Sequence, residues 1–362
     1  MNLGLILAIG ESFRDLEKKG QLKRLINYNI KSYARHFDKV YIFSYKNDRN
    51  FKIPKNCVLV TNKRGVNRFF YSLLLPFLKN SEFKNCDVIR GLQITGGIPA
   101  VVAKIFLGKK FVINYGYDYA KFASIENKKL QSLLFKVIEM PILKTAERVI
   151  ITSSEIYNKL SKKINRKKLL LIPNGVDNKL FKPAYNKKSN QFTVMFIGRI
   201  EKQKNLENLI IAAQKLPKIK IILIGNGSLK GQLKLLSKRK KVTIKIVPPV
   251  DYEEIPKNLA RADVFALPSL VEGNPKILLE AMACQKAVIG TNVEGIRELI
   301  INKYNGILTD TDHDSIRSGL IELLDDKLRQ KLGKQARKFI IENYDIEKLL
   351  EKENRILLKL AK

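Results

Sequence analysis

The chain has 362 residues, of which 45% are hydrophobic, enough for about two packed domains, and no uncharged apolar run is long enough to cross a membrane. Its three cysteines and two histidines are too few and too scattered for a disulfide framework, a zinc site or a histidine-rich metal site, which indicates reduced thiols in a cytoplasmic protein. The formal net charge is +34 at pH 7, which attracts anions such as nucleic acid, anionic lipid or a phosphorylated substrate without choosing among them.

The first half of the chain alternates short apolar runs with longer amphipathic stretches. The run that opens it, MNLGLILAIGES, has no positive residues before it and no small-residue cleavage site, so we expect a buried strand and not a signal peptide. The predicted strands of this half are 3–9, 40–44, 58–61, 88–90, 111–115, 149–152 and 169–172. Apolar strands bounded by helices indicate a parallel sheet covered on both faces.

Three segments of the first half could carry function. The loop 10–21 contains glycine, which would let the backbone approach a ligand, although a mobile surface loop explains it equally well. Residues 63–79, KRGVNRFFYSLLLPFLK, suit either an anionic membrane surface or, as we favour, a core helix with a basic solvent face. Residues 114–122, NYGYDYAKF, place three tyrosines and Asp118 after a buried strand, where they could bind carbohydrate or simply pack in the core.

The second half repeats the alternation. Its predicted strands are 192–197, 219–224, 242–247, 264–267, 287–290 and 306–308, and its clearest helices are 205–216, 228–239 and 275–284. The polar segment 179–191 contains proline and shows no periodicity, which is typical of a linker. Two such series predict an α/β fold of two doubly wound domains, 1–180 and 181–345, followed by a C-terminal helix, 346–362, that could pack back on the first domain.

The stretch 268–280, PSLVEGNPKILLE, places Glu272 and Glu280 around an Asn-Pro pair. We expect Asn274 to be a helix N-cap and Pro275 the first helical residue. The N–H groups that would then point out of the helix start, and form an anion site, belong to Lys276, Ile277 and Leu278. With two carboxylates to hold sugar hydroxyls, the segment suits a nucleotide sugar, although an ordinary βα junction with one solvated and one salt-bridged glutamate explains it equally well.

Other junctions after predicted strands carry weaker signals. Arg199 and Lys204, in the run FIGRIEKQKN, could clamp a diphosphate, although a solvated charged loop is the favoured explanation for this run alone. The run IGNGSLKG, residues 224–231, has the glycine spacing of a tight βα turn near a nucleotide and not that of an NAD site. The run Asp310-Thr311-Asp312 could hold a divalent ion, but we favour Asp312 or Asp314 as a helix N-cap.

The order of these motifs resembles glycosyltransferase family 4, the retaining nucleotide-sugar transferases of GT-B fold. The matching pieces are IPNGVD (172–177), FIGRIEKQKN (196–205), IGNGSL (224–229), ADVFALPSLVEGNPKILLEAMAC (262–284), AVIGTNVEGIREL (287–299) and NGIL (305–308). The resemblance covers residues 148–345 well and the rest loosely. It implies two Rossmann-like domains with a deep interdomain cleft, the first binding the acceptor and the second the nucleotide sugar.

The resemblance also implies roles for individual residues. Arg199 and Lys204 would bind the donor diphosphate and stabilise charge on the leaving group. Glu272 would hold hydroxyls of the donor sugar, and Glu280 would bind the ribose hydroxyls. Further contacts with the donor are implied at Gly198, Asn274, Pro275, Lys276, Ile277, Leu278, Val247 and Val250.

The acceptor side departs from the family pattern. The family's glycine-rich acceptor loop is reduced to Lys19-Gly20, so Gly20 corresponds to it only loosely. The family usually places a histidine after a strand of the first domain, near the reacting sugar. Here that run is NYGYDYAKF, in which Tyr117 and Asp118 are the candidate side chains.

These implications predict a glycosyltransferase that moves a sugar from a UDP- or GDP-sugar to an acceptor hydroxyl with retention, using no metal or other cofactor. A surface glycan or lipid-linked saccharide is the expected acceptor, and the basic charge suits a protein resting on the inner face of the cell membrane. One alternative is a nucleotide-sugar epimerase of the same fold, which needs no acceptor. The other is a basic nucleic-acid-binding protein, although no nucleic-acid module is recognisable.

Overall fold

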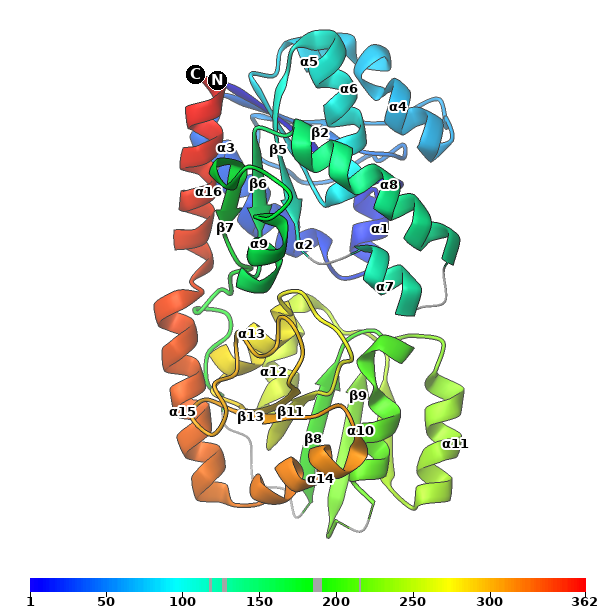
Figure 1. Ribbon diagram of the computed structural model, residues 1–362, viewed down its shortest axis with the longest axis vertical. Coiled ribbons are helices and arrows are strands. Elements are labelled where there is room, and N and C mark those ends of the chain that lie inside the picture. The colour runs from blue at the N-terminus through cyan, green and yellow to red at the C-terminus, as the bar shows by residue number, and fades with distance from the viewer. Residues whose placement is uncertain (117–118, 126–128, 185–190, 215) are drawn as a thin grey trace. The chain divides into compact units, whose positions relative to one another are not determined.

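The computed structural model describes residues 1–116, 119–125, 129–184, 191–214 and 216–362 (Figure 1). The chain forms two compact units. Unit 1 consists of Met1–Ala120, Lys129–Pro173 and Glu347–Lys362, and unit 2 consists of Lys121–Lys128 and Asn174–Ile346. Each unit has its own parallel sheet, as the two series of apolar runs predicted.

Within the described residues, unit 1 contains a seven-stranded parallel sheet in the order β3-β2-β1-β4-β5-β6-β7. Its strands are β1 Asn2–Ile6, β2 Lys39–Phe43, β3 Cys57–Val60, β4 Val88–Gly91, β5 Lys110–Tyr115, β6 Arg148–Ile151 and β7 Leu169–Leu171. β1 lies between β2 and β4, and its Leu3 is opposite Val40 on one side and Val88 on the other. All seven predicted strands of this half are confirmed, with ends that differ by a few residues.

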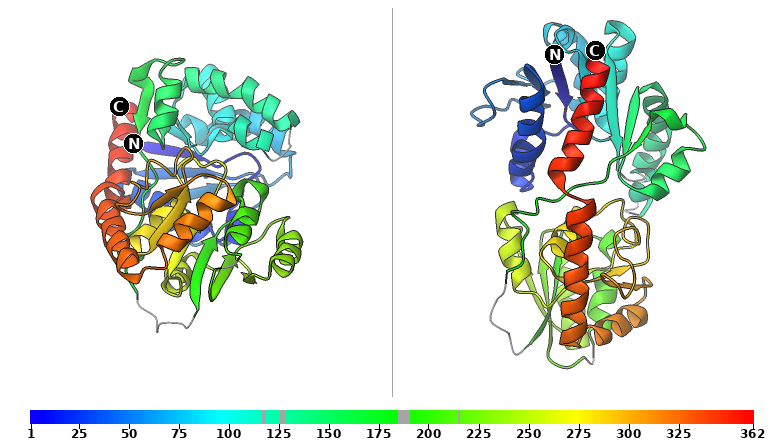
Figure 2. Two further views of the ribbon diagram at one scale, coloured as in Figure 1. Left: turned by 60° about the horizontal axis from the view of Figure 1, so that its bottom comes forward. Right: turned by 90° about the vertical axis from the view of Figure 1, so that its left-hand side faces the viewer.

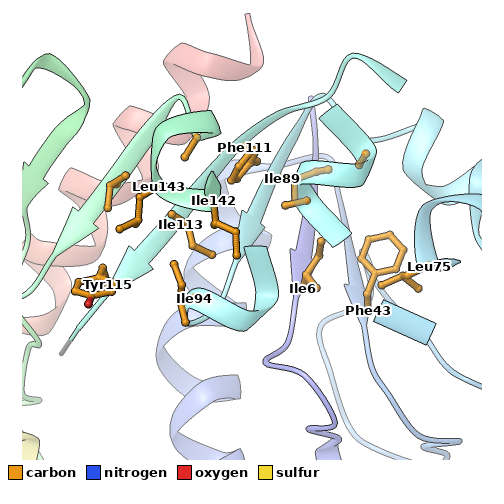
Figure 3. Packing of buried hydrophobic residues seen from close by; sticks show 14 of the residues in the cluster. Ile6, Phe43, Leu75, Ile89, Ile94, Phe111, Ile113, Tyr115, Ile142 and Leu143 are labelled. Carbon is orange, nitrogen blue, oxygen red and sulfur yellow. The ribbon is translucent and has the colours of Figure 1, made fainter. Parts of the chain in front are cut away.

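Helices cover both faces of this sheet. The helices of unit 1 are α1 Phe13–Lys18, α2 Leu22–Arg24, the π-helix η1 Leu25–Ile30, α3 Lys31–His36, α4 Arg68–Leu78, α5 Asn80–Lys84, the 3₁₀ turns η2 Ile94–Gly96 and η3 Arg166–Lys168, α6 Gly97–Leu107, α8 Lys129–Thr145, α9 Ser154–Leu160 and nearly all of α16 Ile346–Ala361. Helix α7, Tyr119–Ile125, spans the boundary between the units. The core under α4, α5, α6, α8 and α9 includes Ile6, Phe43, Leu75 and Phe111 (Figure 3).

The C-terminal helix α16 packs on the opposite face of the unit 1 sheet. Figure 2 shows it in red beside the blue helices that precede β2. Its Leu357 belongs to the second core of unit 1, which includes Leu3, Leu5 and Tyr33. Hydrogen bonds add to this packing, since the Tyr33 hydroxyl donates to Glu353 at 2.7 Å.

Within the described residues, unit 2 contains a six-stranded parallel sheet in the order β10-β9-β8-β11-β12-β13. Its strands are β8 Phe192–Ile197, β9 Ile219–Ile224, β10 Thr243–Val247, β11 Val264–Leu267, β12 Ala287–Thr291 and β13 Ile307–Thr309. Its helices are η4 Lys202–Lys204, α10 Leu206–Ala212, α11 Lys230–Lys240, η5 Tyr252–Glu254, α12 Ile255–Ala260, α13 Lys276–Ala283, α14 His313–Glu322 and α15 Asp326–Asn343. The second series of predicted strands is therefore confirmed as well.

The division between the units falls between Pro173 and Asn174, before the predicted linker 179–191. The reason is that residues just after this point are tied to unit 2. The Val176 N–H donates to the Tyr344 carbonyl at 2.9 Å, and Phe181 is completely buried. The rest of the predicted linker, residues 185–190, lies outside the described residues.

Helix α4 differs from the prediction for residues 63–79. Its inner side packs in the core through Tyr71 and Leu75, as expected of a core helix. Its solvent side, however, is apolar and not basic, with the exposed residues Phe69, Phe70, Leu73, Leu74, Phe77 and Leu78. The predicted basic face is wrong because the basic residues lie at or beyond the two ends of the helix, at Lys63, Arg64, Arg68 and Lys79.

Across the part of the chain that the structure describes, no helix is both long and apolar enough to cross a membrane.

Candidate functional site

The candidate site lies at the carboxyl edge of the unit 2 sheet, at the point where the order of the strands reverses direction. From β8 the chain continues to β9 and β10 on one side, whereas β11, β12 and β13 lie on the other side. The loops that leave β8 and β11 therefore diverge at the centre of the sheet. A crevice between diverging loops is where ligands bind in open parallel sheets. The predicted residues of both junctions meet here.

A buried ion pair joins these two loops. Lys204, the last residue of η4, donates from Nζ to Oε1 of Glu272, which lies 68 residues later in the loop after β11. The two side chains are 13% and 8% exposed. The Ser269 hydroxyl donates to the same Oε1 at 2.7 Å. Lys204 and Glu272 are therefore not solvated, although two other cations of the first loop, Arg199 and Lys202, are exposed.

Arg199 belongs to the same loop as Lys204 but lies at the surface. Its guanidinium donates from Nη2 to Oε1 of Gln203 at 3.4 Å. The structure therefore brings the two predicted cations into one loop and holds only Lys204 against a carboxylate. A long, exposed arginine has the reach and freedom to turn toward an anion, and its planar fork matches a phosphate.

Two residues that the sequence analysis missed hold the site together. Gln203 is 1% exposed, and its Nε2 donates to the Val271 carbonyl at 2.8 Å. Its own carbonyl accepts from the Leu270 N–H at 2.8 Å. Ser269, which is fully buried, orients Glu272 as described above. The only signal in the sequence was a neutral glutamine between two lysines, which gives no hint of its partner.

Glycines let four loops pack in two pairs, backbone against backbone. A side chain at Gly225, after β9, would overlap the carbonyl oxygen of Gly198, after β8. A side chain at Gly295, after β12, would overlap the carbonyl oxygen of Gly273. The Gly225 N–H donates to the Val247 carbonyl at 2.9 Å, which links the end of β10 to the same group of loops. Gly198 and Val247, both predicted donor contacts, are thus neighbours of one turn, and Val250 lies three residues beyond, partly buried.

The start of α13 corrects the predicted capping. The helix begins at Lys276, and its N-cap is Pro275, with φ −72° and ψ 109°, so Asn274 is not the N-cap and Pro275 is not helical. The reason is that Asn274 bonds elsewhere. Its Oδ1 accepts from the Asn174 N–H at 2.9 Å, and its carbonyl accepts from Asn174 Nδ2 at 2.6 Å.

The same geometry changes the predicted anion site at the helix start. The Leu278 N–H donates to the Pro275 carbonyl at 3.1 Å, inside the first turn of the helix. Leu278 is therefore removed from the predicted set of outward-pointing donors. Lys276 is exposed and Ile277 is partly buried at the first two positions of α13. The segment 172–177, which the sequence linked to the site only by resemblance, contacts the helix start directly through Asn174.

Glu280 lies one turn into α13 and is 3% exposed. Its neighbours Leu279 and Ala281 are completely buried, so this carboxylate lies in a helix that is enclosed by protein. The negative charge of Glu280 acts on the nearby Cys284 thiol. Burial is the largest cause that raises the pKa of this thiol to about 12, and the Glu280 carboxylate also raises it. Glu280 is thus a buried carboxylate close to the start of the helix.

The acceptor-side residues are less informative. Gly20 has φ +65°, and its N–H donates to the Glu17 carbonyl at 2.8 Å, so it ends helix α1 in the left-handed conformation. The predicted irregular loop 10–21 therefore contains a helix, capped at its start by the Ser12 side chain. Tyr117 and Asp118 lie outside the described residues.

The Asp-x-Asp run is explained by helix capping. Asp312 is the N-cap of α14, with its Oδ1 accepting from the N–H groups of Asp314 at 3.0 Å and Ser315 at 2.9 Å, as the sequence favoured. These bonds, that from Ser315 first, lower the pKa of the Asp312 carboxyl. Among the residues that the structure describes, no group of three or more His, Cys, Asp or Glu is arranged to hold a metal ion.

Known proteins resemble this chain in sequence and in fold. The family model described as glycosyl transferases group 1 matches residues 177–339. The UDP-Gal:alpha-D-GlcNAc-diphosphoundecaprenol alpha-1,3-galactosyltransferase of Escherichia coli is 29% identical, over 77% of this chain and 76% of its own. An uncharacterized glycosyltransferase of Methanocaldococcus jannaschii is 30% identical, over 72% of this chain and 71% of its own. The sucrose-phosphate synthase structure from Thermosynechococcus elongatus superposes with a TM-score of 0.84 at 19% identity, over 99% of each chain.

Two Rossmann-like units, each with a parallel sheet, define a GT-B protein. With the family match and these relatives, the chain belongs to the group 1 glycosyltransferases, and it is a glycosyltransferase enzyme.

Proposed function

We propose that this glycosyltransferase takes its sugar from a nucleoside diphosphate donor, held in unit 2, and transfers it with retention to a hydroxyl of a lipid-linked or surface glycan. The observation that carries the proposal is the buried Lys204–Glu272 pair at the switch point of the unit 2 sheet. The name of the Escherichia coli relative, which contains both UDP-Gal and a diphosphoundecaprenol-linked sugar, supports this donor class and this acceptor class.

The chemistry requires stabilisation of a diphosphate as it leaves. Negative charge grows on the diphosphate when the glycosidic bond breaks, so a cation held in place lowers the barrier. Glu272 holds Lys204 in place, so little reorganisation of this cation is needed. Arg199, five residues earlier and exposed, adds a second cation by turning from Gln203 to the phosphate.

Glu272 has a second part in this scheme. Lys204 and Ser269 both bond to its Oε1, so its other oxygen, Oε2, is assigned to a hydroxyl of the donor sugar. Glu280 is assigned to the ribose hydroxyls, and the loop ends at Val247 and Val250 to the base. The backbone of Gly198 and of residues 274–277 completes the contacts with phosphate and sugar.

The reaction in this scheme uses no metal, because protein cations supply the charge that a divalent ion supplies elsewhere. The expected result is that a metal chelator leaves the transfer rate unchanged. A rate that falls with chelator and returns with Mg²⁺ or Mn²⁺ would contradict this part of the proposal.

The test compares two lysines of one turn. Lys204→Ala should lower kcat about 10²–10³-fold with a UDP- or GDP-sugar, the loss typical of one preorganised electrostatic donor. Lys202→Ala is the matched control, since Lys202 begins the same 3₁₀ turn and is exposed, and it should turn over normally. Equal rates for the two variants would remove Lys204 from the mechanism.

The acceptor and the stereochemistry need separate measurements. Transfer should require a lipid-linked acceptor, and NMR of the first product should show the anomeric configuration of the donor sugar. An epimerase of this fold would instead release an altered nucleotide sugar without any acceptor. The donor itself can be found by thermal stabilisation with UDP- and GDP-sugars, because a ligand that binds the folded state raises the melting temperature.

The proposed acceptor and the net charge of +34 both favour an enzyme that acts at the surface of an anionic membrane.

A further inference from the structure

We propose that the outer side of α4 and the end of α6 form a membrane-docking surface of unit 1, which enters the interfacial layer of an anionic bilayer. This inference rests on the proposed function for its purpose, since a lipid-linked acceptor lies in a membrane. It goes further because it names one surface that contacts the membrane. It also states that apolar side chains insert into the bilayer, in addition to the attraction of charge.

The first observation is the inverted polarity of α4. A surface helix normally turns its polar residues to solvent and its apolar residues to the core. In α4 the one serine, Ser72, is fully buried, with its Oγ 3.1 Å from the Tyr45 hydroxyl. The solvent side instead carries two phenylalanines near the start, Phe69 and Phe70, and Phe77 near the end, with leucines between them. Phe70 is 66% exposed.

The second observation is that this apolar surface continues onto a neighbouring helix. Helices α4 and α6 lie side by side in unit 1 (Figure 1). Ile105 and Phe106, at the end of α6, are 67% and 63% exposed. The rings of Phe77 and Phe106 meet edge to face, with centroids 5.0 Å apart. A continuous exposed apolar patch of this kind marks an interaction surface.

The third observation is the charge around the patch. The segment 61–79, which carries most of the patch, contains four basic residues, Lys63, Arg64, Arg68 and Lys79, and no acidic one. The Arg68 guanidinium lies 4.9 Å from the centre of the Phe69 ring, so cation and apolar side chain share one site. This composition, with phenylalanine and leucine beside lysine and arginine, suits binding to an anionic membrane surface. The apolar side chains enter the boundary of the acyl chains, and the cations contact the lipid headgroups.

Charge also favours a membrane over a second copy of this chain. In a symmetric dimer the same patch faces itself. The basic rim of one copy would then oppose the basic rim of the other, which is unfavourable, whereas anionic headgroups complement it.

The absence of tryptophan from the chain allows a direct test of insertion. A single tryptophan introduced as Phe70→Trp should show a blue-shifted emission when vesicles of phosphatidylglycerol and phosphatidylcholine are added. Leu235→Trp is the matched control, because Leu235 on α11 is 60% exposed and belongs to unit 2, not to the patch. Emission from Phe70→Trp that does not change on binding would overturn the proposal.

Vesicle co-sedimentation tests the energetics. Phe70→Glu with Leu74→Glu should weaken binding to the mixed vesicles at least about tenfold, since two large side chains lose their burial. Leu235→Glu should bind like the unchanged protein. The unchanged protein should retain measurable binding at high salt, because screening weakens only the charge component. Binding that is unaffected by the double substitution, or wholly abolished by salt, would show that net charge alone attracts the protein.

Two further measurements separate the possible failures. The double variant should transfer sugar normally to a water-soluble acceptor analogue and lose rate only with acceptor in vesicles. Loss with both acceptors would overturn the assignment of this surface to docking, and absence of transfer in every form would instead refute the proposed function. A concentration-dependent dimer that the double substitution abolishes would assign the patch to a second copy and overturn the proposal.

Discussion

The buried ion pair under α16 allows a sharp prediction about stability. Glu353 of α16 accepts from Nε of Arg90, on β4, at 2.7 Å, and from the Tyr33 hydroxyl at 2.7 Å. The Arg90 and Glu353 side chains are only 5% and 8% exposed. The change we consider is Glu353→Ala, which leaves a buried guanidinium without its carboxylate.

The expected cost follows from this burial. Removing one partner of a buried pair typically lowers the free energy of unfolding by about 3–5 kcal/mol, because the remaining charge stays out of water. For a unit of this size, 1 kcal/mol corresponds to about 2–4 °C, so the melting temperature of unit 1 should fall by about 6–20 °C. Replacing both partners, as Arg90→Met with Glu353→Leu, should cost less than Glu353→Ala alone.

Urea unfolding followed by circular dichroism measures these differences. The control is Arg355→Ala on the same helix, because Arg355 is 77% exposed and its pair with Glu351 lies at the surface. That variant should lose less than about 1 kcal/mol. A Glu353→Ala variant as stable as the control, or a double variant less stable than the single one, would refute the argument that buried charge decides the cost.

Three more predictions concern the packing of glycines and the burial of cysteines. Gly225→Ala should raise the donor KM and destabilise unit 2, because the new side chain would overlap the Gly198 carbonyl. Gly231→Ala is the control: nothing lies within 4 Å of its new side chain, so it should be neutral or mildly stabilising. Similar kinetics for both variants would contradict the packing argument. The three cysteines are buried, so Ellman's reagent should find no reactive thiol in the native protein and three after denaturation. Burial raises the pKa values of these thiols to about 11 or 12, so above about pH 9 only the unfolded state loses their protons. The free energy of unfolding should therefore fall between pH 9 and pH 12. A free energy of unfolding that stays constant over that range would exclude this linkage.

Much of the fold could be read from the sequence because it depends on local patterns. Parallel strands that are covered on both faces are apolar along their whole length, as in β11, where all four residues are buried. The Asp312 cap is equally local, since its partners lie two and three residues away. The resemblance carried by the second half extended this to the fold class and to the enzyme class.

Contacts between distant segments were decided by the tertiary structure. Nothing near Lys204 in the chain shows that Glu272, 68 residues later, is its partner, because strand order alone brings their two loops together. Asn274 resembles an N-cap by its local context. Its side-chain oxygen instead accepts a hydrogen bond from Asn174, 100 residues earlier, and Pro275 is the N-cap.

The apolar outer side of α4 has the same origin. Its sequence is apolar on all sides, so only the packing of Tyr71 and Leu75 into the core determines which residues remain in water. Local propensity and hydrophobic pattern act over a few residues, and so the sequence by itself determined the elements and their order. Partner choice depends on which loops the folded sheet brings to one edge, and this the tertiary structure alone decided.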